Sequence, residues 1–405
     1  MTKGDAMSGQ EAANAGKVAA PSEVVDNRCF AVRHAMALID LKGRRTEAAE
    51  KLLSSICDAL KADSRVKELT RPPLRPHLVY RGEAYPWVKN YESDLPLTGR
   101  DHFHTLQLSD PILFSVNVPA ENQEEFRGVK TFPRGSYFVS WDGISLTVMW
   151  EQQSPGTVSV AAGRVAIDVL RDAIKRSYLG LYVQACNPNC QNIFTHANAL
   201  LVFPGVEAPK SMWQTVMFTL PARLADKDPG EILTWWHRRV RQPFFLFSLY
   251  KNGARRIRDI ESIVSRRLFT LLALQQQRAQ LRVTPIRKRF AAWARLWGWK
   301  RKTRKAMADI WLGLAAIGFI NRQWSEDRRR FTEQIDEGEG KLRPLFDQDS
   351  TDDLAAIDTM DLSLAREALD YSSARLDSRS MVAVTALAGL AGLLGALLGA
   401  ALASE

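Results

Sequence analysis

Histidine and cysteine side chains come close together in two stretches of the sequence, and both raise the question of a metal site. Cys186 and Cys190 flank an Asn-Pro-Asn turn with His196 six residues later, and His102 and His104 share one face of an extended segment. A structural zinc site needs four ligands, usually in paired spacing, and neither stretch has a second pair. We therefore expect no metal and no cofactor, and we expect reduced cysteines.

Carboxylates at helix spacing are the other candidates for chemistry. Asp168 and Asp172 are four residues apart in an amphipathic segment, where they fit the solvent-facing side of a helix better than an acid–base pair. The sequence contains none of the phosphate-binding, dinucleotide-binding, zinc-protease, hydrolase or kinase signatures. It therefore favours a protein without enzymatic activity, with an enzyme of unrecognised type as an alternative.

A strongly basic segment with interleaved aromatic residues occupies positions 262–308. It contains no acidic residue, in a chain whose formal net charge is +10. This mixture is typical of a helix that lies on an anionic lipid surface. The residues expected to touch that surface are Phe290, Trp293, Arg295, Trp297, Trp299, Lys300 and Arg301. Two other binding partners of the basic segment remain as alternatives. One is nucleic acid, because such side chains also contact phosphates and bases. The other is the acidic stretch of the chain itself, residues 326–370.

The C-terminal residues 381–403 contain no charge. As a helix this segment would be about 34 Å long, which matches a bilayer core of about 30 Å. Arg375 and Arg379 precede it, which places the bulk of the chain in the cytoplasm. We therefore predict one C-terminal transmembrane helix that anchors the chain. The uncharged run 310–321 is too short to span a bilayer and is expected to be a buried helix, with a re-entrant segment as the alternative.

The predicted transmembrane helix is rich in alanine and glycine, which recur every fourth position along two neighbouring ridges. In lipid, small residues let helices approach closely, so packing drives their association. We therefore expect the chain to form a homo-oligomer through this helix. The residues expected at the packing interface are Ala388, Gly392, Gly395, Ala396, Gly399 and Ala403.

Three further regions can be recognised by their patterns. Residues 1–27 are rich in small and charged residues and are predicted to be a disordered leader. Residues 28–70 carry apolar residues at helix spacing and are predicted to form a helical hairpin. Residues 222–380 carry helix spacing repeatedly and are predicted to be a helical region with breaks at Pro243, Gly253, Pro285 and the Gly338-Glu339-Gly340 turn.

Residues 71–221 have the pattern of an α+β domain. Asp142-Gly143 lies between two apolar runs and is the strongest short signal for a β-hairpin. Further strands are expected on both sides, and residues 164–177 are expected to form an amphipathic helix. We therefore predict an antiparallel sheet with helices on one face. The fold class is α+β, followed by a helical region and one transmembrane helix.

The order of these regions resembles that of membrane effectors of bacterial conflict systems, which act in antiphage defence, including the caspase-associated CATRA class. The segment Arg379-Ser-Met-Val-Ala-Val-Thr-Ala-Leu, which leads into the predicted membrane helix, is similar to the corresponding segment of CorA-type channels. The Gly-Met-Asn loop and the second membrane span of that family are missing. Magnesium transport is therefore not implied. The resemblance implies a single-pass protein of the bacterial inner membrane, with a cytoplasmic domain that senses an unknown protein partner and an oligomer that perturbs the bilayer. The alternative is a passive scaffold that recruits a partner to the membrane.

Overall fold

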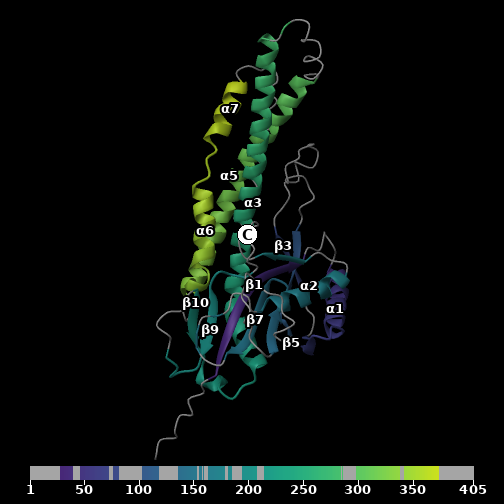
Figure 1. Cartoon of the computed structure of the whole chain (residues 1–405), viewed down its shortest axis with the longest axis vertical. Coiled ribbons are helices and arrows are strands. Elements are labelled where there is room, and N and C mark those ends of the chain that lie inside the picture. The colour runs from purple at the N-terminus through teal and green to yellow at the C-terminus, as the bar shows by residue number, and fades with distance from the viewer. Residues whose placement is uncertain are drawn as a thin grey trace, which may run out of the picture.

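A computed structural model of the chain describes residues 28–39, 46–72, 76–81, 103–117, 136–152, 155–156, 158, 163–177, 181–184, 194–207, 214–283, 285, 298–337 and 342–373. Within these residues the fold is α+β: a mostly antiparallel sheet at one end and long helices that project from it (Figure 1). The predicted leader and the predicted transmembrane helix lie outside the described residues. Among the helices that are described, none is both long enough and apolar enough to cross a membrane.

The sheet is built around the long strand β1. Seven strands follow the order β10-β9-β1-β7-β6-β5-β2, and β8 also pairs with β1; β9 and β10 are parallel, and the other pairs in this sheet are antiparallel. A separate hairpin joins β3 and β4. The strands are β1 (Cys29–Ile39), β2 (Val66–Thr70), β3 (Pro76–Arg81), β4 (Phe103–Leu108), β5 (Ile112–Asn117), β6 (Ser136–Trp141), β7 (Ser145–Gln152), β8 (Leu181–Gln184), β9 (Asn198–Val202) and β10 (Thr215–Thr219).

Helices cover both faces of this sheet, so the prediction of a single helical face is wrong. Along β1, Phe30 and Val32 belong to a core shared with helix α3 (Pro229–Val283), whereas Ala31 and Ala35 belong to a core shared with α1 (Thr46–Lys61) and α2 (Arg164–Arg176). A strand covered on both faces is apolar at successive positions rather than at alternate ones.

The prediction of a helical hairpin over residues 28–70 is wrong except for α1. Its first half is β1, and its end is β2. Since β1 is buried at every position, its apolar residues also satisfy helix spacing, and periodicity alone does not separate the two structures.

The predicted hairpin at Asp142-Gly143 is confirmed, with β6 and β7 paired on either side of it. Gly143 has a φ of 89°, in the left-handed region, and a Cβ there would lie 2.3 Å from the carbonyl oxygen of Leu106. Asp142 accepts hydrogen bonds through Oδ1 from the backbone N–H groups of Ile144 and Ser145, at 2.9 and 2.7 Å. The predicted helix at 164–177 is also confirmed, as α2.

The projecting helices form a stalk. Helix α3 runs away from the sheet, α5 (Trp299–Glu337) packs along it, and α6 (Asp347–Asp358) and α7 (Ser363–Ser373) follow α3 outward again (Figure 1). Two short 3-10 turns cover Ala222–Leu224 and Arg343–Leu345. The predicted buried helix at 310–321 is confirmed within α5, where Ile310 and Ile317 are buried.

Helix α3 is continuous through Pro243 and Gly253, so the breaks predicted at these two residues are wrong. A proline inside a helix removes one backbone hydrogen bond and is unfavourable by itself. The flanking residues Trp236, Val240, Phe244 and Phe247 are all buried in the core that α3 shares with the sheet and the other stalk helices. This packing offsets the local penalty, because apolar burial of four large side chains stabilises by several kcal/mol, roughly 1.5–3 each.

Candidate membrane-facing end of the stalk

Three helices meet at the end of the stalk that lies away from the sheet; we call this the distal end and define it as residues 266–283 of α3, 299–311 of α5, and α7 (Figure 1). The indole N–H of Trp299 donates to the carbonyl oxygen of Leu274 at 3.2 Å. The side-chain amide of Gln275 donates to Ser372 Oγ at 2.6 Å. The end of α3, the start of α5 and the end of α7 therefore lie side by side.

Three of the seven predicted membrane-surface residues lie in the described structure, all at the distal end. Lys300 and Arg301 are exposed in the first turn of α5. Trp299 is only partly exposed, because its indole bonds to α3 and the guanidinium of Arg278 lies 4.4 Å from the centre of its ring. This tryptophan therefore holds α5 against α3. The other four, Phe290, Trp293, Arg295 and Trp297, and the six packing residues of the predicted transmembrane helix lie outside the described residues.

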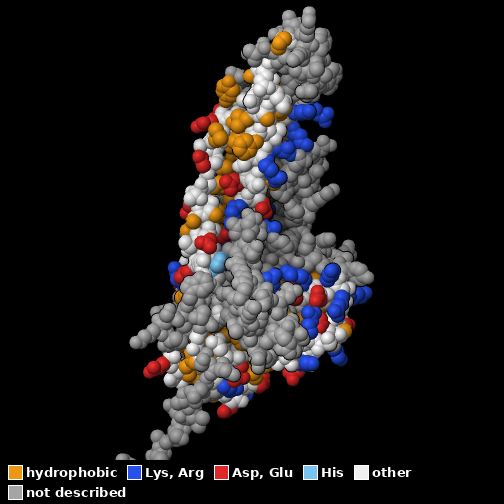
Figure 2. Space-filling view, viewed as in Figure 1, with side chains coloured by type: hydrophobic (Ala, Val, Ile, Leu, Met, Phe, Trp, Pro, Cys, Tyr) orange, Lys and Arg blue, Asp and Glu red, His pale blue; other side chains and the backbone are white. Residues whose placement is uncertain are grey.

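The distal end is rich in exposed basic side chains. In the upper stalk, Lys and Arg side chains gather along the edge away from α7, while Asp and Glu side chains follow the α6–α7 edge (Figure 2). The sequence of the described distal parts of α3 and α5 contains one acidic residue, Asp309, which is buried and pairs with Arg267 at 3.1 Å. The exposed basic side chains here are Arg266, Arg278, Lys300, Arg301, Lys302, Arg304 and Lys305.

Several carboxylates of the acidic stretch 326–370 are paired with groups outside the basic segment 262–308. Asp353 Oδ2 lies 2.6 Å from Lys251 Nζ, and its Oδ1 lies 3.0 Å from Arg258 Nη2. Asp336 pairs with Arg343. Burial raises the pKa of the Asp353 carboxyl, and the adjacent ammonium of Lys251 opposes that rise. This buried cluster fixes α6 on α3.

His196, considered above as a metal ligand, is bonded to α6 instead. Asp349 is fully buried, and its carboxylate accepts a hydrogen bond from the His196 backbone N–H and lies 3.0 Å from His196 Nδ1. Cys186, Cys190 and His102 lie outside the described residues, as does the side chain of His104. No group of three or more potential metal ligands occurs within the part of the chain that is described.

A second buried polar network joins the β6–β7 turn to α3. Asp142 Oδ2 lies 3.4 Å from His237 Nε2 and 3.5 Å from Arg241 Nε. Burial raises the pKa of Asp142, but the His237 imidazole and the backbone N–H groups of Ser145 and Ile144 outweigh it and hold this pKa below its ordinary value. Asp142 and His237 are at most 1% exposed, so substrate has no access and the network serves to position α3. Local sequence patterns carry no signal for a contact across 95 positions.

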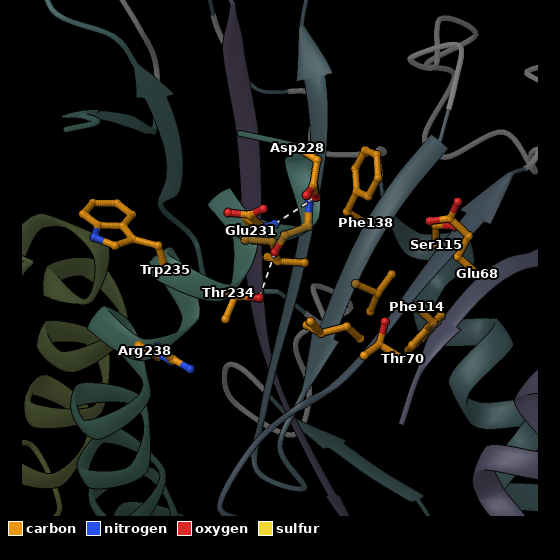
Figure 3. Close-up of a pocket in the computed structure, with 14 residues that line it drawn as sticks. Glu68, Thr70, Phe114, Ser115, Phe138, Asp228, Glu231, Thr234, Trp235 and Arg238 are labelled. Atoms are coloured by element: carbon orange, nitrogen blue, oxygen red, sulfur yellow. Dashed lines mark hydrogen bonds between the residues drawn. The ribbon is translucent and has the colours of Figure 1, made fainter. Parts of the chain in front are cut away.

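An open groove in the described part of the α+β domain is large enough to receive a partner. It has a volume of about 470 Å³ and lies between β2, β5 and β6 and the first turns of α3 (Figure 3). Glu68, Asp228 and Glu231 line it together with Arg238, so its carboxylates favour a cationic group. Asp228 also caps α3, because its Oδ1 accepts hydrogen bonds from the backbone N–H groups of Gly230 and Glu231.

The carboxylates considered for acid–base chemistry both lie in α2 and are paired with arginine side chains. Asp168 pairs with Arg171 of the same helix, and Asp172 pairs with Arg65 at 2.8 Å.

Comparison of the chain with protein-family models, with curated proteins and with solved structures finds no match in any of the three. Its function has to be inferred from its own residues.

Proposed function

We propose that this chain is a single-pass protein of the bacterial inner membrane, anchored by residues 381–403, with the sheet and the stalk on the cytoplasmic side. One observation carries the proposal: α7 ends at Ser373 at the same end of the stalk where α3 ends and α5 begins. A bilayer at this end would meet both the uncharged segment and the basic, aromatic segment 284–298. The seven residues between Ser373 and Met381 can span at most about 25 Å.

The charge of the distal end supports an anionic lipid surface as the partner. Lys300 and Arg301 are exposed there, and each basic residue near such a surface contributes about 1 kcal/mol. Nucleic acid would also be attracted to these side chains. A bilayer is the better candidate because the chain continues from α7 into 23 uncharged residues, 381–403.

The proposed activity is that of a regulated membrane effector. A partner bound in the groove lined by Glu68, Asp228 and Glu231 would contact the first turns of α3. Helix α3 is one continuous helix of 55 residues, about 82 Å long, and reaches the distal end. Association of the terminal helices through Gly392, Gly395 and Gly399 would then perturb the bilayer. A passive scaffold is the second candidate, since the same anchor and groove would suffice to recruit a partner.

Two variants of the full chain separate anchoring from activity. Deletion of residues 381–405 should move the protein from the membrane to the soluble fraction. Gly395→Ile with Gly399→Ile should leave it in the membrane, because the helix becomes more apolar, but should abolish cross-links between the terminal helices themselves by holding their backbones apart. The measurements are alkaline extraction of membranes, cross-linking, and membrane potential after induced expression.

The outcomes discriminate among the candidates. If the truncated chain still resists alkaline extraction, residues 381–403 are not the anchor. If the double variant is anchored but no longer depolarises cells that wild type depolarises, the effector function is supported. If wild type never depolarises cells with its genomic neighbours present, the scaffold is the better description.

A further inference from the structure

Among the side chains that the structure describes on α3 and α7, four large apolar ones are exposed at the distal end. Phe269 is 71% exposed and Leu272 37%, on α3; Leu364 is 56% exposed and Tyr371 52%, on α7. The two helices run in the same direction, and the hydrogen bond between Gln275 and Ser372 fixes their relative height. Phe269 and Leu272 lie six and three residues before Gln275. Leu364 and Tyr371 lie eight and one residues before Ser372, so all four lie within about two helical turns of one another along the stalk.

The same four residues share one side of the stalk. Leu272 is three residues from Gln275, which contacts α7, and Phe269 is eleven residues from Arg258, which contacts α6, so both lie on the α6–α7 side of α3. Leu364 and Tyr371 are seven residues apart and share one face of α7. Hydrophobic side chains gather over α7 and the adjoining helix in the upper stalk (Figure 2). We call Phe269, Leu272, Leu364 and Tyr371 the apolar patch.

The two borders of the apolar patch carry opposite charges. Arg266 is exposed on α3 and lies three residues before Phe269. Glu367 is exposed on α7, between Leu364 and Tyr371. A patch with one basic and one acidic border is complementary to a copy of itself that is turned by 180° about an axis along the stalk, because that rotation places the α3 border of one copy opposite the α7 border of the other.

We propose that the apolar patch binds the same patch of a second copy, in a parallel dimer with its two-fold axis along the stalk and with Arg266 of each copy opposite Glu367 of the other. This inference rests on the proposed function in one respect: copies anchored in one membrane by the same terminal helix stand parallel and at equal height. The patch lies close to that anchor, since Tyr371 is ten residues before Met381. An anionic leaflet fits less well as the occupant, because Glu367 would be repelled by it.

The test uses two full-length versions of the chain, co-expressed with different tags, in which Cys186 and Cys190 are replaced by Ser. One version carries Phe269→Cys and the other Leu364→Cys, and membranes are treated with a mild oxidant. The dimer predicts a disulfide between the two versions, because α3 of each copy faces α7 of the other. A control pair with Ala315→Cys, exposed on α5, in place of Leu364→Cys should give no linked product.

A charge exchange then tests the borders. Arg266→Glu in both versions should abolish the linked dimer, and addition of Glu367→Arg should restore it. Equal linking with the Ala315→Cys control, or a double exchange that fails to restore the dimer, would overturn the proposal. A patch covered by lipid or by the chain's own terminal segment would give no disulfide between the two versions, which also overturns it.

Failure of this proposal is distinguishable from failure of the proposed function. Each sample is first separated into membrane and soluble fractions, and cross-linking is read in whichever fraction contains the protein. A protein found only in the soluble fraction contradicts the membrane anchor, and linkage through the apolar patch would still be read there. A protein in the membrane fraction that gives no linked product contradicts the patch dimer and leaves the anchor standing.

Discussion

At the scale of single residues, His34 shows how the contact between sheet and stalk constrains protonation. It lies in β1, fully buried, and the indole N–H of Trp236 in α3 donates to its Nε2 at 2.8 Å. An indole is only a donor, so Nε2 must hold a free lone pair and the imidazole must be neutral. The ring also stacks on Phe244. Burial, followed by the charges of His237 and Arg33, lowers the pKa of His34 to about 3.

This low pKa predicts a loss of stability in acid. An unfolded histidine takes up a proton near pH 6.5, whereas folded His34 does so only near pH 3, so stability falls as the pH drops between these values. We expect the free energy of unfolding to be lower at pH 4.5 than at pH 7 by about 2–3 kcal/mol from this residue. Urea unfolding followed by tryptophan fluorescence measures it.

The matched control is His34→Gln, whose amide oxygen can accept from Trp236 but does not titrate. Its unfolding free energy should depend less on pH over the same interval. Equal acid sensitivity of the variant and the wild type would show that the proton is taken up elsewhere.

At the scale of elements, the packing of α3 on α5 explains a glycine in the middle of a helix. A Cβ at Gly253 would lie 2.9 Å from Cδ1 of Trp324 in α5. Trp324 is buried and stacks on Tyr250 of α3, with ring centres 5.4 Å apart. The absence of a side chain at position 253 therefore lets α5 approach α3 closely. Gly318 of α5, by contrast, has no heavy atom within 4 Å of the position a Cβ would take.

Alanine substitution at these two glycines should have opposite effects. Gly318→Ala should stabilise the protein by about 0.5–1 kcal/mol, because alanine restricts the unfolded chain and favours the helix. Gly253→Ala gains the same local preference but displaces Trp324, and we expect a net destabilisation of about 1–3 kcal/mol. Thermal unfolding followed by circular dichroism compares them. A Gly253→Ala variant as stable as Gly318→Ala would mean that α5 shifts without strain.

At the scale of the whole molecule, the stalk separates the sheet from the distal end with its exposed basic side chains. Exposed Lys300 and Arg301 lie at the distal end of α5, whereas Arg328 lies near the end of the same helix that approaches the sheet. Electrostatic attraction to a lipid surface falls off within about 10 Å at ordinary ionic strength. A bilayer at the distal end should therefore attract Lys300 and Arg301 but not Arg328.

Liposome binding tests this asymmetry with the chain truncated after residue 380, which lacks the predicted anchor. Lys300→Gln with Arg301→Gln should weaken binding to anionic vesicles by roughly tenfold or more, at about 1 kcal/mol for each charge, and the effect should shrink at high salt. Arg322→Gln with Arg328→Gln is the control and should bind as the parent does. Equal binding by both variants would remove the lipid-docking role of the distal end.

Local signals were sufficient for several elements of this protein. The β6–β7 hairpin could be predicted because Asp142 and Gly143 are dictated by the turn itself, through a side chain that bonds the next two N–H groups and a residue that tolerates a positive φ. Helix α2 could be predicted because one of its faces is solvated, so its apolar residues follow one period. The uncharged terminal segment and the basic segment are likewise properties of the sequence alone.

Tertiary structure decided the features that depend on distant residues. Strand β1 is buried on both faces, so its apolar pattern loses the alternation that marks a strand, and only its pairing with β7, β8 and β9 makes it one. Helix α3 continues through Pro243 because apolar packing outweighs the missing hydrogen bond. The pairs Asp142–His237 and Lys251–Asp353 bring together residues about 100 positions apart. The periodicity of apolar residues indicates which side of a segment is buried, but it does not indicate which other element packs on that side. The features above depend on the identity of the packing partner.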